Sequence, residues 1–524
     1  MTKVLSVSII AAGALTLVAC EGGAWTSHGY GYDDYDRYGT SSSSGDVDSS
    51  RYSRSSSSGS SAIDSFDPSC VDPSGFDGRG CFACEPTTND ELLNACTKSR
   101  FETFDNAARI AGFDPQDPRP AIPALGPTPS PFNGGSKDPS GTLPPAPACP
   151  VASKPNPIMV VGATGFPLET IAKAMGTQAT IFYLEKSSCD GVASLLLGDP
   201  KISGEVVYFD ANGTKNRCEL AAPQTADIGL SSLFAETCAG ESGLASPVTM
   251  PQDIKDFLGP ASTVMFAVPA TSKERAISAE AAYRVFGFGA KSNVSPWNDE
   301  RFIFRRGPTS GNQTTVGLSL GLSTSAFRGR DSNGSSNMLD ALRTSSSPGK
   351  TIGISSSEIV DVNRDVLKSL AYRHSNQAVA FYPDSDPAAL DRRNVRDGHY
   401  FMWLPLHVMV RTDRGEPVAV GAAHDAAVKR LVYVMTSRQE PPVKSVDLMG
   451  AYKRVGNVPA CAMHVQRVRE AAPLEPITPV APCDCAFEAS APGTTPAECK
   501  ACDSSAECPS TRPVCSFGYC EAAR

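Results

Sequence analysis

Residues 157–176, PIMVVGATGFPLETIAKAMG, constrain the fold more than any other part of the chain. The apolar run from Ile158 to Val161 predicts a buried strand, and the turn from Gly162 to Gly165 leads into an amphipathic helix. A strand, a loop and a helix N-terminus in this order aim unpaired backbone N–H groups and the positive end of the helix dipole at one point. The stretch therefore predicts an α/β fold with an anion-ready first loop.

Apolar strand-like runs alternate with helical stretches from residue 158 to about residue 460. This alternation predicts a mostly parallel sheet with helices on both faces, and the length favours two lobes over one. The expected strands are 158–162, 205–209, 264–268, 301–304, 350–354, 378–382 and 401–410, and the expected helices include 278–286 and 357–372.

The first twenty residues predict a bacterial lipoprotein signal peptide with a lipobox. Lys3 precedes an apolar run that is too short to span a membrane, and small residues lead to Cys20. We expect the Cys20 thiol to carry lipid and to anchor the protein to a membrane of the bacterial cell envelope, facing the periplasm or the cell surface. The alternative is an ordinary secretory signal with an incidental cysteine.

The chain has 17 cysteines, and setting Cys20 aside leaves an even number, which indicates disulfides in an oxidising compartment. Residues 66–112 are expected to form a small Cys-rich segment with one helix at about 89–111, and residues 461–524 a second one. Zinc or a redox dithiol at Cys81 and Cys84, and a metal cluster in the tail, are the alternatives. The lack of nearby histidines and of a second paired motif favours disulfides.

Two further stretches predict linkers. Residues 21–65 are rich in Ser and Gly and have no apolar period, so they cannot offset their ordering entropy and should form a disordered tether. Residues 113–156 are rich in proline and predict a semi-extended linker pinned at Cys149. The net charge of −9, without a basic block, makes nucleic acid an unsuitable partner.

Four polar stretches lie at expected strand ends or helix starts between residues 157 and 320. Backbone N–H groups and hydroxyls at such positions donate to anions, and an arginine can hold an oxyanion with two parallel hydrogen bonds. Their candidate ligand-binding residues are Thr164, Gly165 and Phe166 in the first stretch, Ser188 in the second, Ser231 and Ser232 in the third, and Arg306, Ser310, Gly311 and Asn312 in the fourth.

The order of these stretches resembles the periplasmic phosphate-binding proteins of ABC transporters, within the type II solute-binding family. The similar segments are Gly162 to Pro167 (the family's Gly-Ala-Thr-Phe-Pro loop), Ser188 to Val192 (its Ser/Gly helix start), Asp227 to Ser231 (its Asp-Phe-Gly-Ala-Ser strand) and Arg306 to Asn312 (its Arg-x-x-x-Ser-Gly-Thr loop). The resemblance covers about residues 157–410. It implies a two-lobed domain over 157–460, with residues 157–260 and 390–460 in one lobe and 261–389 in the other.

The resemblance also implies a function. A lipid-anchored receptor would capture phosphate or a similar small oxyanion between its lobes by hinge closure and pass it to an ABC permease, without catalysis, cofactor or metal. Two positions depart from the family: Ser232 stands where the family's phosphate-reading Asp is found, and Asn312 replaces a Thr. A carboxylate at the first position accepts a proton carried by the ligand and repels an anion that has none, whereas a serine can donate to either kind of anion. The ligand could therefore be phosphate, sulfate, another tetrahedral oxyanion or an organophosphate, and the absence of any ligand is a further alternative.

Parts of the sequence also fit two other functional classes. The long tether and the Cys-rich flanks suit a surface or envelope interaction protein that uses the same fold without transport. The Gly317-to-Gly321 stretch matches the GxSxG pattern of hydrolases, but no strand is evident before Ser319. His399, His407 and His424 are too scattered to predict a metal site.

Overall fold

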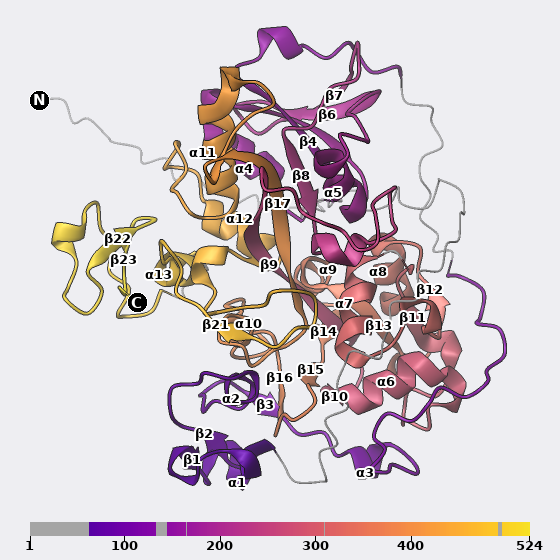
Figure 1. The fold of residues 1–524 in the computed structure, drawn as a ribbon. Coiled ribbons are helices and arrows are strands. Elements are labelled where there is room, and N and C mark those ends of the chain that lie inside the picture. Colours follow the sequence, from indigo (N-terminus) through magenta and orange to yellow (C-terminus); the bar gives the residue numbers. More distant parts are fainter. Residues whose placement is uncertain (1–61, 133–143, 164, 309, 491–494, 524) are drawn as a thin grey trace, which may run out of the picture.

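The computed structural model describes residues 62–132, 144–163, 165–308, 310–490 and 495–523. Within them the chain forms a two-lobed α/β domain with a small disulfide-rich segment at each end, as the sequence predicted (Figure 1). The expected signal peptide with Cys20, most of the expected tether, and Thr164 lie outside the described residues. In the part of the chain that is described, no helix is both long and apolar enough to cross a membrane.

One long strand, β9 (Ile254–Pro269), runs from one lobe into the other. Its first half pairs with β17 (Trp403–Asp413), and its second half pairs with β13 (Ile352–Ser356). The main sheet follows the order β12-β11-β13-β9-β17-β8-β4-β5-β6-β7. Its other strands are β4 (Pro157–Gly162), β5 (Thr180–Glu185), β6 (Glu205–Phe209), β7 (Lys215–Glu219), β8 (Ile228–Ser231), β11 (Ile303–Arg305), β12 (Arg330–Asp331), β14 (Leu367–Ser369), β18 (Glu416–Pro417) and β19 (Asn457–Val458).

The main sheet is mixed, so the prediction of a mostly parallel sheet was wrong. Parallel pairing joins β4 to β5 and β8, and β11 to β12 and β13. The strands that cross between the lobes pair antiparallel, and so do β6 and β7, which a short turn connects. A turn of a few residues permits only an antiparallel pair, whereas a parallel pair needs a long crossover.

Successive side chains of β4 point to opposite faces of the sheet, and helices cover both faces, as expected. Ile158 and Val160 join a core with α4 (Leu168–Met175), α11 (Asp425–Met435) and α12 (Leu448–Arg454). Met159 and Val161 point the other way, toward α5 (Ser188–Leu196). Because both faces are covered, β4 is apolar along its whole length.

The second lobe is built around β11, β12 and β13. It contains α6 (Ala279–Phe288), α7 (Gly311–Leu320), α8 (Ser335–Arg343) and α9 (Ser357–Val362). A four-stranded sheet of β10 (Ala276–Ser278), β15 (Ala371–Arg373), β16 (Ala380–Phe381) and β3 (Phe101–Glu102) joins the N-terminal segment to this lobe. The short helix α10 (Arg393–Arg396) lies in the return segment.

Two expected helices are broken. The expected helix 357–372 ends at Val362, where the Asn363 side chain bonds the Ile359 carbonyl, and Leu367–Ser369 pairs with β9 as β14. The expected helix 89–111 is two helices, α2 (Asn89–Leu93) and α3 (Asn106–Arg109), separated by β3, which pairs with β16. In both cases an available strand edge offered backbone partners that outweigh the local helix preference.

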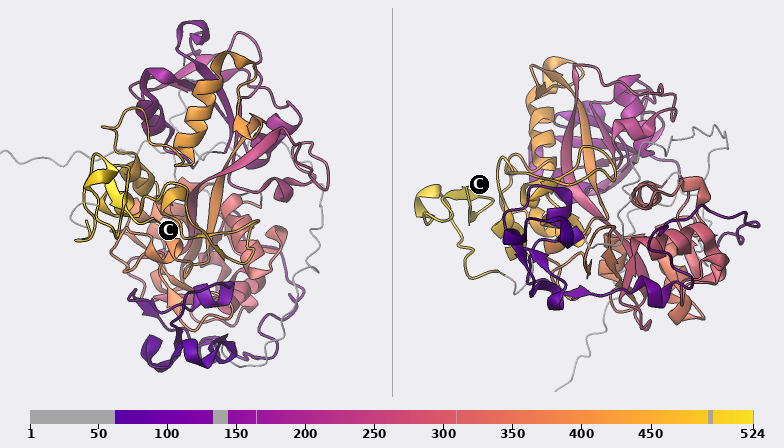
Figure 2. Two further views of the ribbon diagram at one scale, coloured as in Figure 1. Left: turned by 60° about the vertical axis from the view of Figure 1, so that its left-hand side comes forward. Right: turned by 60° about the horizontal axis from the view of Figure 1, so that its bottom comes forward.

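Disulfides, not metal ligands, account for the sixteen cysteines of the described residues. The pairs are Cys70–Cys84, Cys81–Cys96, Cys149–Cys218, Cys189–Cys238, Cys461–Cys483, Cys485–Cys499, Cys502–Cys515 and Cys508–Cys520. The flanking segments contain β1 (Val71–Asp72), α1 (Gly75–Gly78), β2 (Cys81–Phe82), β20 (Val465–Gln466), β21 (Glu475–Pro476), α13 (Asp484–Ala489), β22 (Val514–Ser516) and β23 (Tyr519–Glu521). Figure 2 shows the indigo N-terminal segment and the yellow C-terminal segment at the ends of the colour scale, outside the two lobes.

The end of the proline-rich linker is joined to β7 of the first lobe by the Cys149–Cys218 disulfide, and its earlier part, residues 119–132, is docked on the second lobe. Its carbonyls accept hydrogen bonds from arginines of that lobe: Arg328 reaches Gly126 and Pro127, and Arg330 reaches Ser130. Phe132 packs edge-on against Phe304 of β11. Because proline lacks an N–H, the linker contributes acceptors here and the lobe contributes donors.

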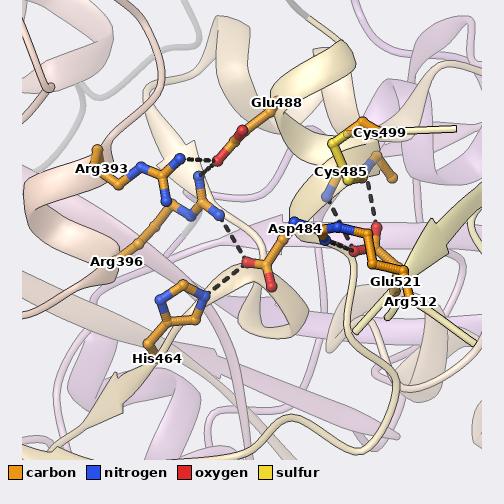
Figure 3. The surroundings of a disulfide bond; sticks show 10 residues. Arg393, Arg396, His464, Asp484, Cys485, Glu488, Cys499, Arg512 and Glu521 are labelled. Carbon is orange, nitrogen blue, oxygen red and sulfur yellow. Dashed lines mark hydrogen bonds and ion pairs between the residues drawn. A yellow bond between two sulfur atoms is a disulfide. The ribbon is translucent and has the colours of Figure 1, made fainter. Parts of the chain in front are cut away.

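A buried charge cluster holds the C-terminal segment to the return segment (Figure 3). The Arg396 guanidinium donates to Asp484 and to Glu488, at 2.7 Å in each case. His464 lies 2.7 Å from Asp484, and Glu521 accepts from the first backbone N–H groups of α13. Each charge in this cluster faces an opposite charge or backbone donors, which offsets the cost of its burial.

Candidate functional site

A small cavity of about 100 Å³ lies where the two lobes meet the crossing strands. Most of its polar lining comes from loops and helix N-termini of both lobes. The lining residues are Ala163, Gly165, Ser188, Ser232, Ser262, Arg306, Gly307, Ser310, Gly311, Asn312, Asn333, Gly334, Ser335, Ser356, Glu358, Leu404 and Leu406.

Close glycine packing sets the first-lobe wall. Gly162 has φ +125°, and a Cβ there would lie 2.0 Å from the Leu230 carbonyl oxygen. A Cβ at Gly191 would meet the same oxygen at 2.0 Å. Only glycine permits this approach. It lets the first turn of α5 lie against the ends of β4 and β8, so three loops of the first lobe meet at one place.

Ser188 and Ser232 line this wall and hydrogen-bond each other. Their hydroxyl oxygens are 2.8 Å apart, and the Ser232 backbone N–H donates to Ser188 Oγ at 3.1 Å. The Cys189–Cys238 disulfide joins the start of α5 to the turn after β8. The serine pair is therefore fixed from two sides, and the described side chains that this lobe adds to the cavity are uncharged.

The second-lobe wall carries the positive charge. Arg306 follows β11 and is 8% exposed, and its Nη1 donates to Ser335 Oγ at 2.7 Å. The neighbouring Arg305 is instead paired with Asp331 at 2.8 Å and does not line the cavity. Of the two consecutive arginines at this strand end, the structure therefore brings one to the cavity.

Three helices of eight or more residues begin at the cavity, and the shorter α9 begins beside them with Ser356 as its N-cap. The three longer helices are α5 at Ser188, α7 at Gly311 with Ser310 as its N-cap, and α8 at Ser335 with Gly334 as its N-cap. Gly334 has φ +112°, a conformation that favours glycine at this cap. Helix N-termini present unpaired N–H groups and partial positive charge, so their convergence favours an anion.

Glu358 is the acidic residue of the lining and comes from the first turn of α9. The side chain of Ser356 donates to it at 3.4 Å. Burial raises the pKa of Glu358 to about 7, and the nearby Arg306 guanidinium opposes that rise. The cavity therefore holds one arginine and one carboxyl that ionises near neutral pH.

The two lobes touch across the cavity. A Cβ on Gly311 would lie 2.8 Å from Ser232 Oγ, so these residues of opposite lobes are in near contact. Leu404 and Leu406 of β17 and Ser262 of β9 complete the lining from the crossing strands. The described conformation is thus a closed one.

The structure brings seven of the ten expected site residues to the cavity: Gly165, Ser188, Ser232, Arg306, Ser310, Gly311 and Asn312. Two others lie outside its lining. Phe166 is 2% exposed and packs toward Gly259 under the first loop, and Ser231 Oγ donates to the Leu233 carbonyl at 2.7 Å within the turn. Thr164, the tenth, is not among the described residues.

Sequence reasoning missed the lining from α8 and α9. Asn333, Gly334 and Ser335 stand in an Asn-Gly-Ser run before a helix, which is a start signal of the same kind as the one at Ser310. Ser356 ends the buried β13 and Glu358 lies in the first turn of α9, where the sequence predicted only the start of a helix. Both signals were visible, but only the tertiary fold directs them at Arg306.

The alternative catalytic and metal patterns are not assembled into sites. Ser319 lies inside α7, and its hydroxyl donates to the Thr315 carbonyl at 2.8 Å, so it is not at a strand-to-helix elbow. The three scattered histidines have separate partners: His399 bonds the Ala95 carbonyl, His407 bonds Asp256, and His424 bonds Asn156.

The size of the cavity limits what it can hold. At about 100 Å³, the cavity has room for several waters but not for a large molecule. Sites for drug-sized molecules are about 300 Å³ or larger. The cavity matches an ion of a few heavy atoms, and its donors and arginine suit an oxyanion.

No protein-family model and no curated protein matches this sequence. Among solved structures, the chain is similar to a phosphate ABC transporter substrate-binding protein with bound phosphate from Clostridium perfringens, at 11% identity and a TM-score of 0.36, over 58% of this chain and 99% of that one. It is also similar to a possible phosphate-binding protein from Planctomyces limnophilus, at 12% identity and 0.35, over 58% and 93%. An ABC-type phosphate transport receptor from Vibrio cholerae matches at 14% identity and 0.35, over 57% of this chain and 99% of that receptor.

Proposed function

We propose that this protein is a substrate-binding protein that captures phosphate or a similar tetrahedral oxyanion in the cavity between its lobes. The observation that carries the proposal is the convergence of Arg306 and the N-termini of α5, α7 and α8 on a cavity of about 100 Å³. A fork of guanidinium donors and a ring of N–H and O–H donors can satisfy the oxygens of one small anion.

Capture would proceed by closure of the lobes. The first lobe supplies Ser188 and Ser232, and the second supplies Arg306 and the start of α7. An oxyanion that contacts both walls binds the closed state better than the open one, so it shifts the population toward closure. The strands β9 and β17, which cross between the lobes, are the hinge in this proposal.

The place of the protein in the cell belongs to the same proposal. A lipid on Cys20 would tether the receptor to a membrane of the bacterial envelope, with the oxyanion delivered to an ABC permease. Disulfides throughout the described chain suit an oxidising compartment of this kind. Pull-down from envelope extract separates this role from surface attachment: recovery of a permease supports transport, and recovery of wall or surface components alone supports attachment.

Calorimetry of the intact chain with phosphate, arsenate and sulfate tests the binding step. We expect one site for at least one of these anions, and loss of its affinity by about a hundredfold or more in Arg306→Ala, since a charged hydrogen-bond donor is removed. Arg301→Ala is the matched control, because Arg301 is a surface arginine with 74% of its side chain exposed. Absence of heat for every anion with a folded wild-type protein would contradict the proposal.

A further inference from the structure

The side chain of Glu358 places a carboxyl group in the lining of a cavity that is otherwise suited to oxyanions. It is the acidic side chain in the lining, and it stands on the same lobe as Arg306. A carboxylate repels a fully ionised anion but accepts a hydrogen bond from one that carries a proton.

The position of Glu358 is fixed by its surroundings. Ser357 Oγ donates to the Gly456 carbonyl at 2.8 Å, which holds the start of α9 against the loop before β19. Gly456 has φ +71°, and a Cβ there would lie 2.1 Å from Ser357 Oγ, so the Ser357 side chain packs directly against the backbone of Gly456. Ser356 donates to Glu358 Oε1 at 3.4 Å. These contacts keep the carboxyl at the cavity.

Among the described residues, the opposite wall has no carboxylate. Ser232, directly after β8, is hydrogen-bonded to Ser188, and the other described lining residues of the first lobe are alanine, glycine and leucine. The charge balance of the cavity is therefore one arginine against one carboxyl, both from the second lobe. A dianion without a proton would be attracted by Arg306 and the helix N-termini but repelled by the ionised carboxylate of Glu358.

We propose that Glu358 is the specificity-determining residue of this cavity: it accepts the proton-bearing oxygen of the ligand, so that phosphate and arsenate bind and the fully ionised sulfate and selenate are rejected. The inference rests on the proposed function and deepens it. The carboxylate that sequence reasoning found missing at Ser232 is supplied from a different element, α9, in the other lobe. Burial, which raises the pKa of Glu358, is consistent with a carboxyl that shares a proton with its ligand.

The test uses pairs of anions of matched shape, on the intact chain at pH 8. At this pH phosphate and arsenate still carry one proton, whereas sulfate and selenate carry none. We expect the wild type to prefer phosphate over sulfate, and arsenate over selenate, by at least about tenfold, since an unpaired buried carboxylate opposes the second member of each pair. Equal affinities within both pairs would overturn the inference while leaving oxyanion binding intact.

Glu358→Gln gives the second arm. Glutamine keeps the shape and removes the charge, and its amide N–H₂ can donate to an ionised oxygen. We expect sulfate affinity to rise and phosphate affinity to fall, so that the preference shrinks by about tenfold or more, with Glu219→Gln on the exposed edge strand β7 as the control. An unchanged ratio in a folded variant would overturn the assignment, because a purely structural role would move both affinities together. If the wild type binds no oxyanion at all, the proposed function itself fails.

Discussion

Gly311 and Ser232 show how finely one residue on each lobe sets the cavity. With 2.8 Å between a Cβ at Gly311 and Ser232 Oγ, the closed conformation leaves no room for a methyl group. Closure and ligand contact are thus linked at this pair, because both residues also line the cavity.

The Gly311→Ala variant should weaken oxyanion binding by about tenfold, since overpacking of a close contact costs on the order of 1–3 kcal/mol. Ser232→Ala removes the oxygen that the new methyl group meets. We therefore expect the double variant to bind more tightly than Gly311→Ala alone, measured by calorimetry with phosphate. A double variant as weak as the sum of the two single changes would show that the two residues do not meet in the bound state.

Among single residues, the sequence identified the hydrogen-bond donors of the cavity but not its carboxyl group. Ser188, Ser310, Gly311 and Arg306 were recognisable because each stands at a strand end or a helix start. Glu358 was not, because nothing in a Ser-Ser-Ser-Glu run says which loop it will face. Its partner Arg306 lies 52 positions earlier, the difference between 358 and 306.

At the scale of elements, the disulfide Cys189–Cys238 connects the start of α5 to the turn after β8. It closes a loop with a sequence separation of 49, for which chain entropy suggests about 4 kcal/mol of stabilisation. It also holds the two elements that supply Ser188 and Ser232, so its effect should extend to the cavity.

The Cys189→Ala/Cys238→Ala variant should lower both the unfolding midpoint in urea and the affinity for phosphate. The matched control is Cys508→Ala/Cys520→Ala, which removes a disulfide of separation 12 in the C-terminal segment. That control should leave the affinity unchanged. Equal affinity in both variants would show that the disulfide does not position the serine pair.

Continuous apolar runs were predicted correctly, whereas stretches whose structure depends on distant pairing partners were not. The strands β4 and β6 were found at or within one residue of their bounds, because their apolar runs are continuous. The stretch after Val362 was misread as helix, since its apolar spacing suits both a helix and the edge pairing of β14 with β9. Pairing partners far along the chain decided between the two, and local pattern cannot supply them.

At the scale of the whole molecule, we expect the buried charge cluster that holds the C-terminal segment to stabilise the fold in a pH-dependent way. His464 donates to Asp397 and Asp484, and these partners raise its pKa against the opposing effect of burial. The same contacts lower the pKa of Asp397. The His464 contribution is therefore full below its unfolded value of about 6.5 and is lost as the pH rises through the raised folded value.

The wild type should exceed His464→Gln in thermal stability by about 2 kcal/mol near pH 5.5, because charged hydrogen bonds are lost, and the difference should shrink toward pH 9. Thermal melts of both proteins across this range measure it, with His424→Gln as the control, since His424 lies outside the charge cluster and its ring is 3.3 Å from the Asn156 side chain. A stability difference that grows with pH would contradict a raised pKa of His464 in the folded protein.

Two lobes on one continuous sheet, a cavity at their junction and a docked disulfide-rich segment at each end describe a receptor whose binding site is built from both lobes (Figures 1 and 2). The two-lobed α/β fold followed from the sequence because alternating strands and helices of this length have few other arrangements. The docking of the linker and flanks did not, since it depends on side chains such as Arg328 and Arg396 that meet partners far along the chain.

The most direct measurement is a crystal structure of the intact protein grown with phosphate at pH 8. The account predicts one phosphate between the lobes, with oxygens within hydrogen-bond distance of Arg306 and of the first N–H groups of α7, and one oxygen facing Glu358 Oε. An empty cavity at saturating phosphate, or a phosphate bound outside it, would contradict the account.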